Sequence, residues 1–118
     1  MKVELKNIVC DDFDLENFSP DNENYFSVDL LLFIGLENEK GSDYYRLNVC
    51  SPECLVNTFW VPKILRHVLL MRSYDLERIK KIINEYVESC EGNSYVEISE
   101  KLSRFFAWEF EDYQPFKG

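Results

Sequence analysis

"FSVDLLLFIGLENEKGSDYYRLNVC", residues 26–50, is the stretch that decides the fold. Its first part repeats apolar side chains at every second position, the period of a strand with one buried face, at Phe26, Val28, Leu30, Leu32 and Ile34. The polar run "ENEKGS" is typical of a turn, and the return segment repeats the alternation at Tyr45, Leu47 and Val49. These residues therefore predict an antiparallel hairpin with one face directed at a core.

Two further strands are predicted on either side of this hairpin. Residues 2–10 alternate with a phase shift near Lys6 and Asn7, which indicates a strand with a local irregularity. The acidic stretch 11–24 carries Pro, Ser and Asn and reads as a surface loop. Residues 64–71, "ILRHVLLM", form a brief apolar run that is typical of a fourth strand.

Helix signals follow in the second half of the chain. Ser and Pro at 51–52 are typical of a helix start, and residues 74–91 place apolar side chains on one helical stripe, with Gly92 where a helix stop belongs. Ser94 and Glu97 then match a capping box, followed by an apolar face at Tyr95, Ile98, Leu102, Phe105 and Phe106.

Strands come mostly first and long helices last, an order that is typical of the α+β class. We expect one domain over residues 1–118, with an antiparallel sheet of about four strands. Two long C-terminal helices and one short helix are expected to pack on one face of this sheet. A chain of 118 residues with 46% hydrophobic side chains is large enough to bury a substantial core without disulfides.

The charge balance restricts the class of partner. The net charge is −9, from 22 acids against 13 bases, which argues against a nucleic-acid partner because Lys and Arg supply affinity for phosphates. An acidic protein attracts basic proteins instead. The opening "MKVELKNIVC" lacks the apolar stretch of a signal peptide, and the longest apolar run falls far short of a membrane helix. We expect a cytoplasmic protein with no membrane partner.

Enzyme and metal-site motifs are sparse. The chain has no Gly-rich phosphate loop, G-x-S-x-G or H-E-x-x-H, and its single histidine, His67, lies in a predicted strand, where a structural role is expected. We therefore expect no enzymatic activity, metal or cofactor. A spatial Cys–His pair, or Glu109 with Glu111 as a carboxylate pair, is the enzymatic alternative. Without a secretion signal, the cysteines should be reduced and mostly buried: Cys10, Cys50, Cys54 and Cys90.

Three clusters of acids exceed what local stability explains. The carboxylates at 88 and 91 lie at the C-terminal end of the helix predicted over residues 74–91, where the helix dipole disfavours them. In the tail, Trp108 and Phe110 alternate with acids, and these rings are expected either to complete the core or to anchor a partner. Solvated acidic surface is the simpler explanation, but the mixture of rings and carboxylates favours a protein-binding site. The predicted contacts are Asp11, Asp12, Asp14, Glu88, Glu91, Glu109, Glu111, Asp112 and Tyr113.

Three segments together, "MKVELKNI", the hairpin and "YVESCEGNSYVEISEKLSRFFAWEFEDYQP", resemble the immunity protein 8 family of bacterial polymorphic-toxin systems. The most specific feature is the pairing of "ESCEG" with a downstream "WEFEDY", and the chain departs from the expected pattern in having Tyr95 where a Trp is expected. The resemblance implies a small cytoplasmic α+β protein that binds and neutralises a cognate toxin.

The net charge favours a basic toxin, such as a nuclease with a basic cleft, as the partner. A subunit of a homo-oligomer, with contacts at an unpaired strand edge and at Leu31 and Phe33, is the alternative to a toxin inhibitor. The identity of the toxin, the mode of inhibition and the oligomeric state stay open at this point.

Overall fold

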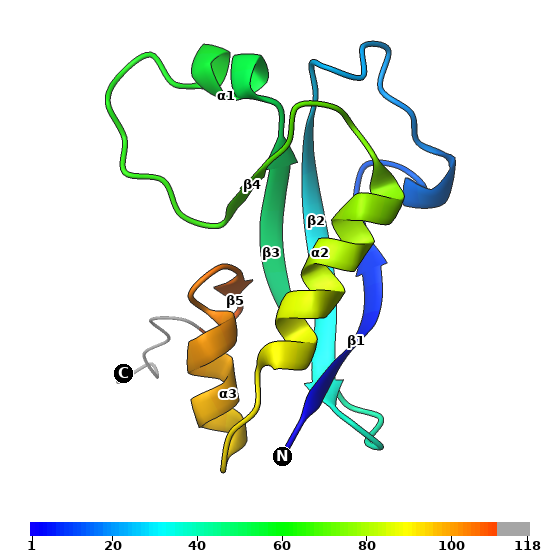
Figure 1. Ribbon diagram of the computed structural model, residues 1–118, viewed down its shortest axis with the longest axis vertical. Coiled ribbons are helices and arrows are strands. Elements are labelled where there is room, and N and C mark those ends of the chain that lie inside the picture. Colours follow the sequence, from blue (N-terminus) through cyan, green and yellow to red (C-terminus); the bar gives the residue numbers. More distant parts are fainter. Residues whose placement is uncertain (111–118) are drawn as a thin grey trace, which may run out of the picture.

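The computed structural model describes residues 1–110. The strands are β1 (Val3–Val9), β2 (Ser27–Leu36), β3 (Asp43–Cys50), β4 (Val68–Leu70) and β5 (Ala107–Trp108). The helices are α1 (Pro52–Thr58), α2 (Leu76–Ser89) and α3 (Tyr95–Leu102), with a short 3-10 turn, η1 (Leu15–Asn17). Figure 1 shows a sheet with α2 lying across it and with α1 beyond the end of β3. The predicted α+β class is confirmed, and the expected count of about four strands is close to the five observed.

The sheet has the order β1-β2-β3-β4, and β5 also pairs with β3. Its pairings are antiparallel except for β3 with β4, which is parallel. The predicted hairpin is confirmed, with Leu30 opposite Leu47 and Leu32 opposite Tyr45. The predicted irregularity in the first strand is confirmed as a register shift between Leu5 and Asn7. The alternating pattern therefore determined both the pairing and the buried face.

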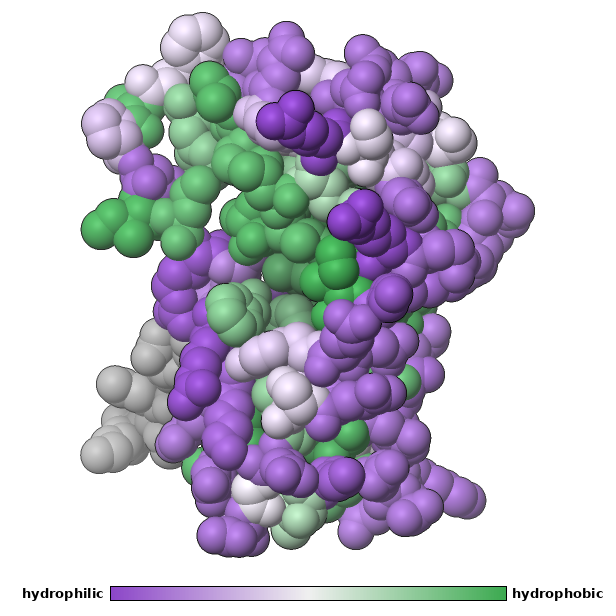
Figure 2. Space-filling model, in the orientation of Figure 1, coloured by the Kyte–Doolittle hydropathy of each residue, from purple (hydrophilic) through white to green (hydrophobic). Residues whose placement is uncertain are grey.

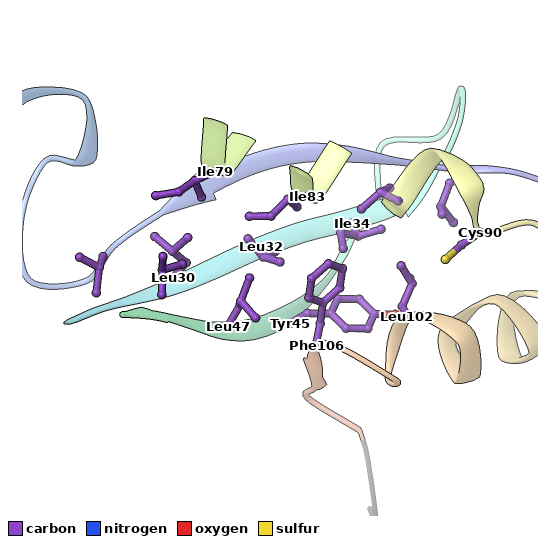
Figure 3. Close-up of a cluster of buried hydrophobic side chains, with 14 of the residues drawn as sticks. Leu30, Leu32, Ile34, Tyr45, Leu47, Ile79, Ile83, Cys90, Leu102 and Phe106 are labelled. Atoms are coloured by element: carbon purple, nitrogen blue, oxygen red, sulfur yellow. The ribbon is translucent and has the colours of Figure 1, made fainter. Parts of the chain in front are cut away.

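The core lies between the sheet and the two longer helices, α2 and α3. Figure 3 shows side chains from β2 and β3 meeting those of α2 and α3, and Leu32, Ile34 and Ile83 are almost completely buried. Each such aliphatic side chain contributes about 1.5–3 kcal/mol when it leaves water. The buried hydroxyl of Tyr45 donates to Ser99 Oγ at 3.2 Å, which satisfies two polar groups inside this core.

The start of α3 follows the predicted capping box. Ser94 Oγ accepts from the Glu97 amide at 3.2 Å, and the Glu97 carboxylate accepts from the Asn93 amide at 3.0 Å. Gly92 does follow α2, but no glycine among residues 1–110 has a positive φ, so it is not a left-handed helix stop. A Cβ at Gly92 would lie 2.9 Å from the carboxyl carbon of Glu97, so the missing side chain makes room for the cap.

Residues 59–67 form a loop between α1 and β4, which we call the 59–67 loop. The fourth strand is therefore shorter than the predicted 64–71, because Ile64 lies in this loop and is 94% exposed. At the loop's end His67 has φ 63°, and its carbonyl accepts from the Asn48 amide at 3.1 Å. This left-handed residue turns the chain into parallel register with β3. Among residues 1–110, no helix is long and apolar enough to cross a membrane.

Candidate protein-interaction surfaces

The first predicted acidic cluster lies in the loop that follows β1, and all three of its carboxylates are exposed. Asp14 has a structural role, because its carboxylate accepts from the Glu16 amide at 3.2 Å and from the Asn17 side-chain amide at 2.6 Å. Asp14 thereby caps η1. Only Asp11 and Asp12 are left to face a partner.

Asp11 and Asp12 line a polar hollow of about 430 Å³, together with Asp29, Arg46, Asn48 and His67. Asp29 and Asn48 alternate with buried residues of β2 and β3, which places them on the sheet face opposite the helices. The Asn48 side-chain amide donates to the Asp29 carboxylate at 2.9 Å and fixes its position. Asp29 was missed as a site residue, and the only sequence signal is that a carboxylate interrupts an otherwise apolar strand.

The second predicted cluster lies at the opposite end of β1. Glu88 and Glu91 are both exposed at the end of α2, and the backbone of Glu91 forms an isolated antiparallel β-bridge with Lys2, just before the first residue of β1. Asp11 lies two residues after the end of that strand, and a strand of seven residues spans about 23 Å. The structure therefore does not bring the two clusters into one site.

Glu109, in the third predicted cluster, forms hydrogen bonds to strand β3 of the fold. Its carboxylate accepts from the Tyr44 amide at 3.1 Å, and its own amide donates to the Tyr44 carbonyl at 3.1 Å. Beside it, half-buried Trp108 donates from Nε1 to the Asp43 carboxylate at 3.1 Å, whereas Phe110 is 44% exposed. The remaining predicted residues of the tail lie outside the described part of the chain: Glu111, Asp112 and Tyr113.

The sheet face opposite the helices also carries apolar side chains. Leu31 and Phe33 are half-buried there, and the Phe33 ring meets the Tyr44 ring edge-on with centroids 6.2 Å apart. Exposed Arg46 lies across from Leu31 in the β2–β3 register. The face that carries the two residues predicted for an oligomer contact is thus a mixed apolar and polar surface.

An apolar groove lies on the helix side, where sequence reasoning predicted no site. The α2–β4 groove is a hollow of about 260 Å³, and its walls include Val68, Leu69, Ile82, Ile83, Tyr86 and Phe105. Figure 2 shows hydrophobic side chains gathered over β4 and the neighbouring part of α2. A second hollow of about 470 Å³ adjoins it, because Ile82 lines both, and it also contains Leu70, Arg72, Asp75 and Arg78.

Large apolar side chains are exposed on α1, in the 59–67 loop and on β4, and also on α2 and just after α3, where they line the groove. We call this set the apolar belt: Val56, Trp60, Val61, Ile64, Leu65, Leu70, Ile82 and Phe105. Trp60 and Ile64 are each 94% exposed. The signal in the sequence was a run of apolar residues around Pro62 that follows neither a helical nor a strand period, which we assigned to regular elements instead.

Burial raises the pKa of several titratable side chains in the described part of the chain. Burial is the main cause that raises the pKa of the Cys50 thiol, and all four cysteines are free. Burial also raises the pKa of Tyr45 and Tyr95. Within residues 1–110, no group of three or more His, Cys, Asp or Glu side chains could hold a metal ion.

Comparison with known proteins yields one family. The family model described as Immunity protein 8 matches residues 3–113, nearly the whole chain. No curated protein matches the chain, and no solved structure matches it.

Proposed function

Because the chain belongs to the immunity protein 8 family over residues 3–113, we propose that it binds and neutralises a cognate polymorphic toxin through protein–protein contacts. The family match supports this proposal most directly. The described surfaces agree with it, since they combine exposed carboxylates, exposed rings and an apolar groove, which are the components of protein interfaces.

The charge of the chain supports a basic toxin domain. A protein with a net charge of −9 steers a basic partner towards itself and raises the association rate above the roughly 10⁵–10⁶ M⁻¹s⁻¹ of neutral pairs. Asp11, Asp12 and Asp29 gather in the polar hollow, where their carboxylates strengthen the attraction for Lys and Arg side chains of an approaching partner. Glu88, Glu91 and the tail acids add to the long-range attraction.

The protein is proposed to act in the cytoplasm by occupying the toxin, without turnover, cofactor or nucleic acid. Burial raises the pKa of the Cys50 thiol and of the Tyr95 phenol, so both groups keep their protons near neutral pH.

Capture from the source bacterium tests this function. The tagged protein should retain one basic protein at about 150 mM salt, and a C-terminal fragment of that protein should kill cells that lack this chain. Asp11→Asn with Asp12→Asn should slow association and weaken its salt dependence, whereas Glu37→Gln, at an exposed acid near the hairpin turn, should have a smaller effect. A toxin-producing culture that yields no retained partner would refute the proposed function.

Self-association is the second candidate, and the half-buried Leu31 and Phe33 on the sheet face opposite the helices favour it. Sedimentation velocity at increasing concentration would reveal a dimer. Replacing Phe33 with Ser should then dissociate that dimer, whereas a concentration-independent monomer excludes this candidate.

A further inference from the structure

Given the toxin binding proposed above, on which this step rests, we infer that the α2–β4 groove and the 59–67 loop form the surface that holds the toxin. The toxin segment that fits this surface carries apolar side chains flanked by carboxylates. The exposed area, the free edge of β4 and the local charge each lead to this assignment.

The exposed area is that of a specific interface. The eight side chains of the apolar belt range from 38% to 94% exposed. A partner that covered all eight, at about 100 Å² each, would bury about 800 Å² here, which is the share of one partner in a standard-size interface. Patches of this size on a soluble chain mark interaction sites, and Trp is among the residues that most often carry binding energy.

The edge of β4 offers backbone groups to a partner. His67 and Met71 bond to β3, through the His67 carbonyl with the Asn48 amide and the Met71 amide with the Cys50 carbonyl. In a strand, successive residues alternate in direction, so Val68 and Leu70 point their amide and carbonyl groups away from β3. Among the described strands, β4 pairs only with β3. An extended toxin segment can therefore pair with this edge while its apolar side chains enter the groove.

The segment that supplies most of this surface is basic, although the whole chain is acidic. Residues 59–82 contain six bases and two acids, a net charge of +4, so the rest of the chain carries −13. One of the six bases, Lys80, is paired with Glu16 at 2.6 Å. Arg72 and Arg78, both exposed, line the hollow that adjoins the groove. Carboxylates on the docked segment complement these guanidinium groups.

A second copy of this chain fits the surface less well. A symmetric dimer would place the same patch against itself, so the basic rim of one copy would face the basic rim of the other. A basic toxin with a locally acidic segment avoids this repulsion. The net charge then acts at long range during approach, while the groove acts at contact and determines the rate of dissociation.

Toxin binding by matched variants tests the assignment, with the captured and purified toxin domain as the probe. Trp60→Ser with Ile64→Ser, and separately Ile82→Ser, should weaken binding at least tenfold, mainly through faster dissociation. Val96→Ser, at a 60% exposed position of α3 outside the groove, should change binding less than twofold. Trp60 and Ile64 bury almost none of their surface, so the double variant should unfold at the wild-type temperature.

Charge reversal tests the chemistry of the docked segment. Arg78→Glu and Lys40→Glu change the net charge equally, and Lys40 lies exposed in the hairpin turn. Arg78→Glu should weaken binding at least tenfold, whereas Lys40→Glu should leave it the same or slightly tighter. Tighter binding by Arg78→Glu would show that the segment is basic and would overturn its assigned chemistry.

The remaining outcomes separate the two proposals. If wild-type protein does not bind the toxin, the proposed function fails and the assignment fails with it. If wild type binds and the groove variants bind equally well, the assignment alone is overturned. Groove variants that lose self-association in sedimentation while keeping toxin affinity would assign the groove to a second copy and also overturn it.

Discussion

Glu109 is the predicted partner contact whose role can be separated most sharply from a structural one. Its carboxylate and its amide both bond to Tyr44, and these two bonds join β5 to the start of β3. Glu109→Ala removes the carboxylate acceptor and leaves the Tyr44 amide without this bond. Glu109→Gln keeps an acceptor oxygen at the same position but removes the negative charge.

The expected loss of stability follows from the strength and the solvent exposure of the hydrogen bond between the Glu109 carboxylate and the Tyr44 amide. A hydrogen bond to a charged group contributes about 1.5–3 kcal/mol when buried, and the half-exposed side chain of Glu109 reduces this to about 1 kcal/mol. Glu109→Ala should therefore lower the melting temperature by about 4 °C, and Glu109→Gln by about half of that.

Urea and thermal unfolding followed by circular dichroism measure these values, with an unchanged denaturant slope as the check for two-state behaviour. Glu88→Ala is the matched control, because this exposed acid in the last turn of α2 opposes the helix dipole and its loss should not destabilise the fold. A Glu109→Ala variant as stable as wild type would refute the stabilising role of the bond between Glu109 and Tyr44. If that variant also lost toxin affinity, Glu109 would be a partner contact after all.

Three further predictions concern positions that shape the fold. Gly35→Ala should destabilise the protein by at least about 1–3 kcal/mol in urea unfolding, because its Cβ would lie 2.1 Å from the Gly41 carbonyl oxygen. Ser94→Ala should cost about 1 kcal/mol in the same assay by removing the acceptor for the Glu97 amide. Burial raises the pKa of Tyr86 to about 12, so the folded state keeps a proton that the unfolded state releases above about pH 10. The contribution of Tyr86 to the free energy of unfolding should be fully present below pH 10 and should fall as pH rises towards 12, by at most about 1.4 kcal/mol per pH unit. Urea titrations at each pH measure this fall.

Each of these predictions has its own control. Gly41→Ala should be tolerated, because a Cβ there meets nothing within 4 Å. Ser94→Asp should keep the cap, so a loss equal to that of Ser94→Ala would contradict the capping role. Tyr86→Phe should make the alkaline decline less steep, with the remainder due to Tyr45 and Tyr95, and an unchanged slope would contradict the contribution of Tyr86.

The features that sequence predicted well are those set by neighbouring residues. The alternation from Phe26 to Val49 gave the hairpin with its buried face, because a shift of one residue would expose the whole apolar set. The capping box needs only Ser94 and Glu97 and was equally readable. The register shift in β1 was visible as a change of phase before Asn7.

The features that sequence missed depend on contacts between distant segments. The parallel pairing of β4 joins Val68 to Asn48, and three residues carry too little pattern to reveal it. The bonds of Glu109 to Tyr44 span 65 residues, so an acid in an aromatic tail looked like a surface contact. Similarly, the gathering of Asp11 with Asp29 required the order of the strands.

The exposed residues of the 59–67 loop can change in evolution at little cost to folding. Trp60 and Ile64 leave 94% of their surface in solvent, so substitutions there should alter stability by no more than about 0.5 kcal/mol. Selection on these two positions then acts mainly through the proposed toxin contact and hardly through folding. Related proteins can therefore differ at these positions, and so bind different toxins, while the sheet and helices remain unchanged.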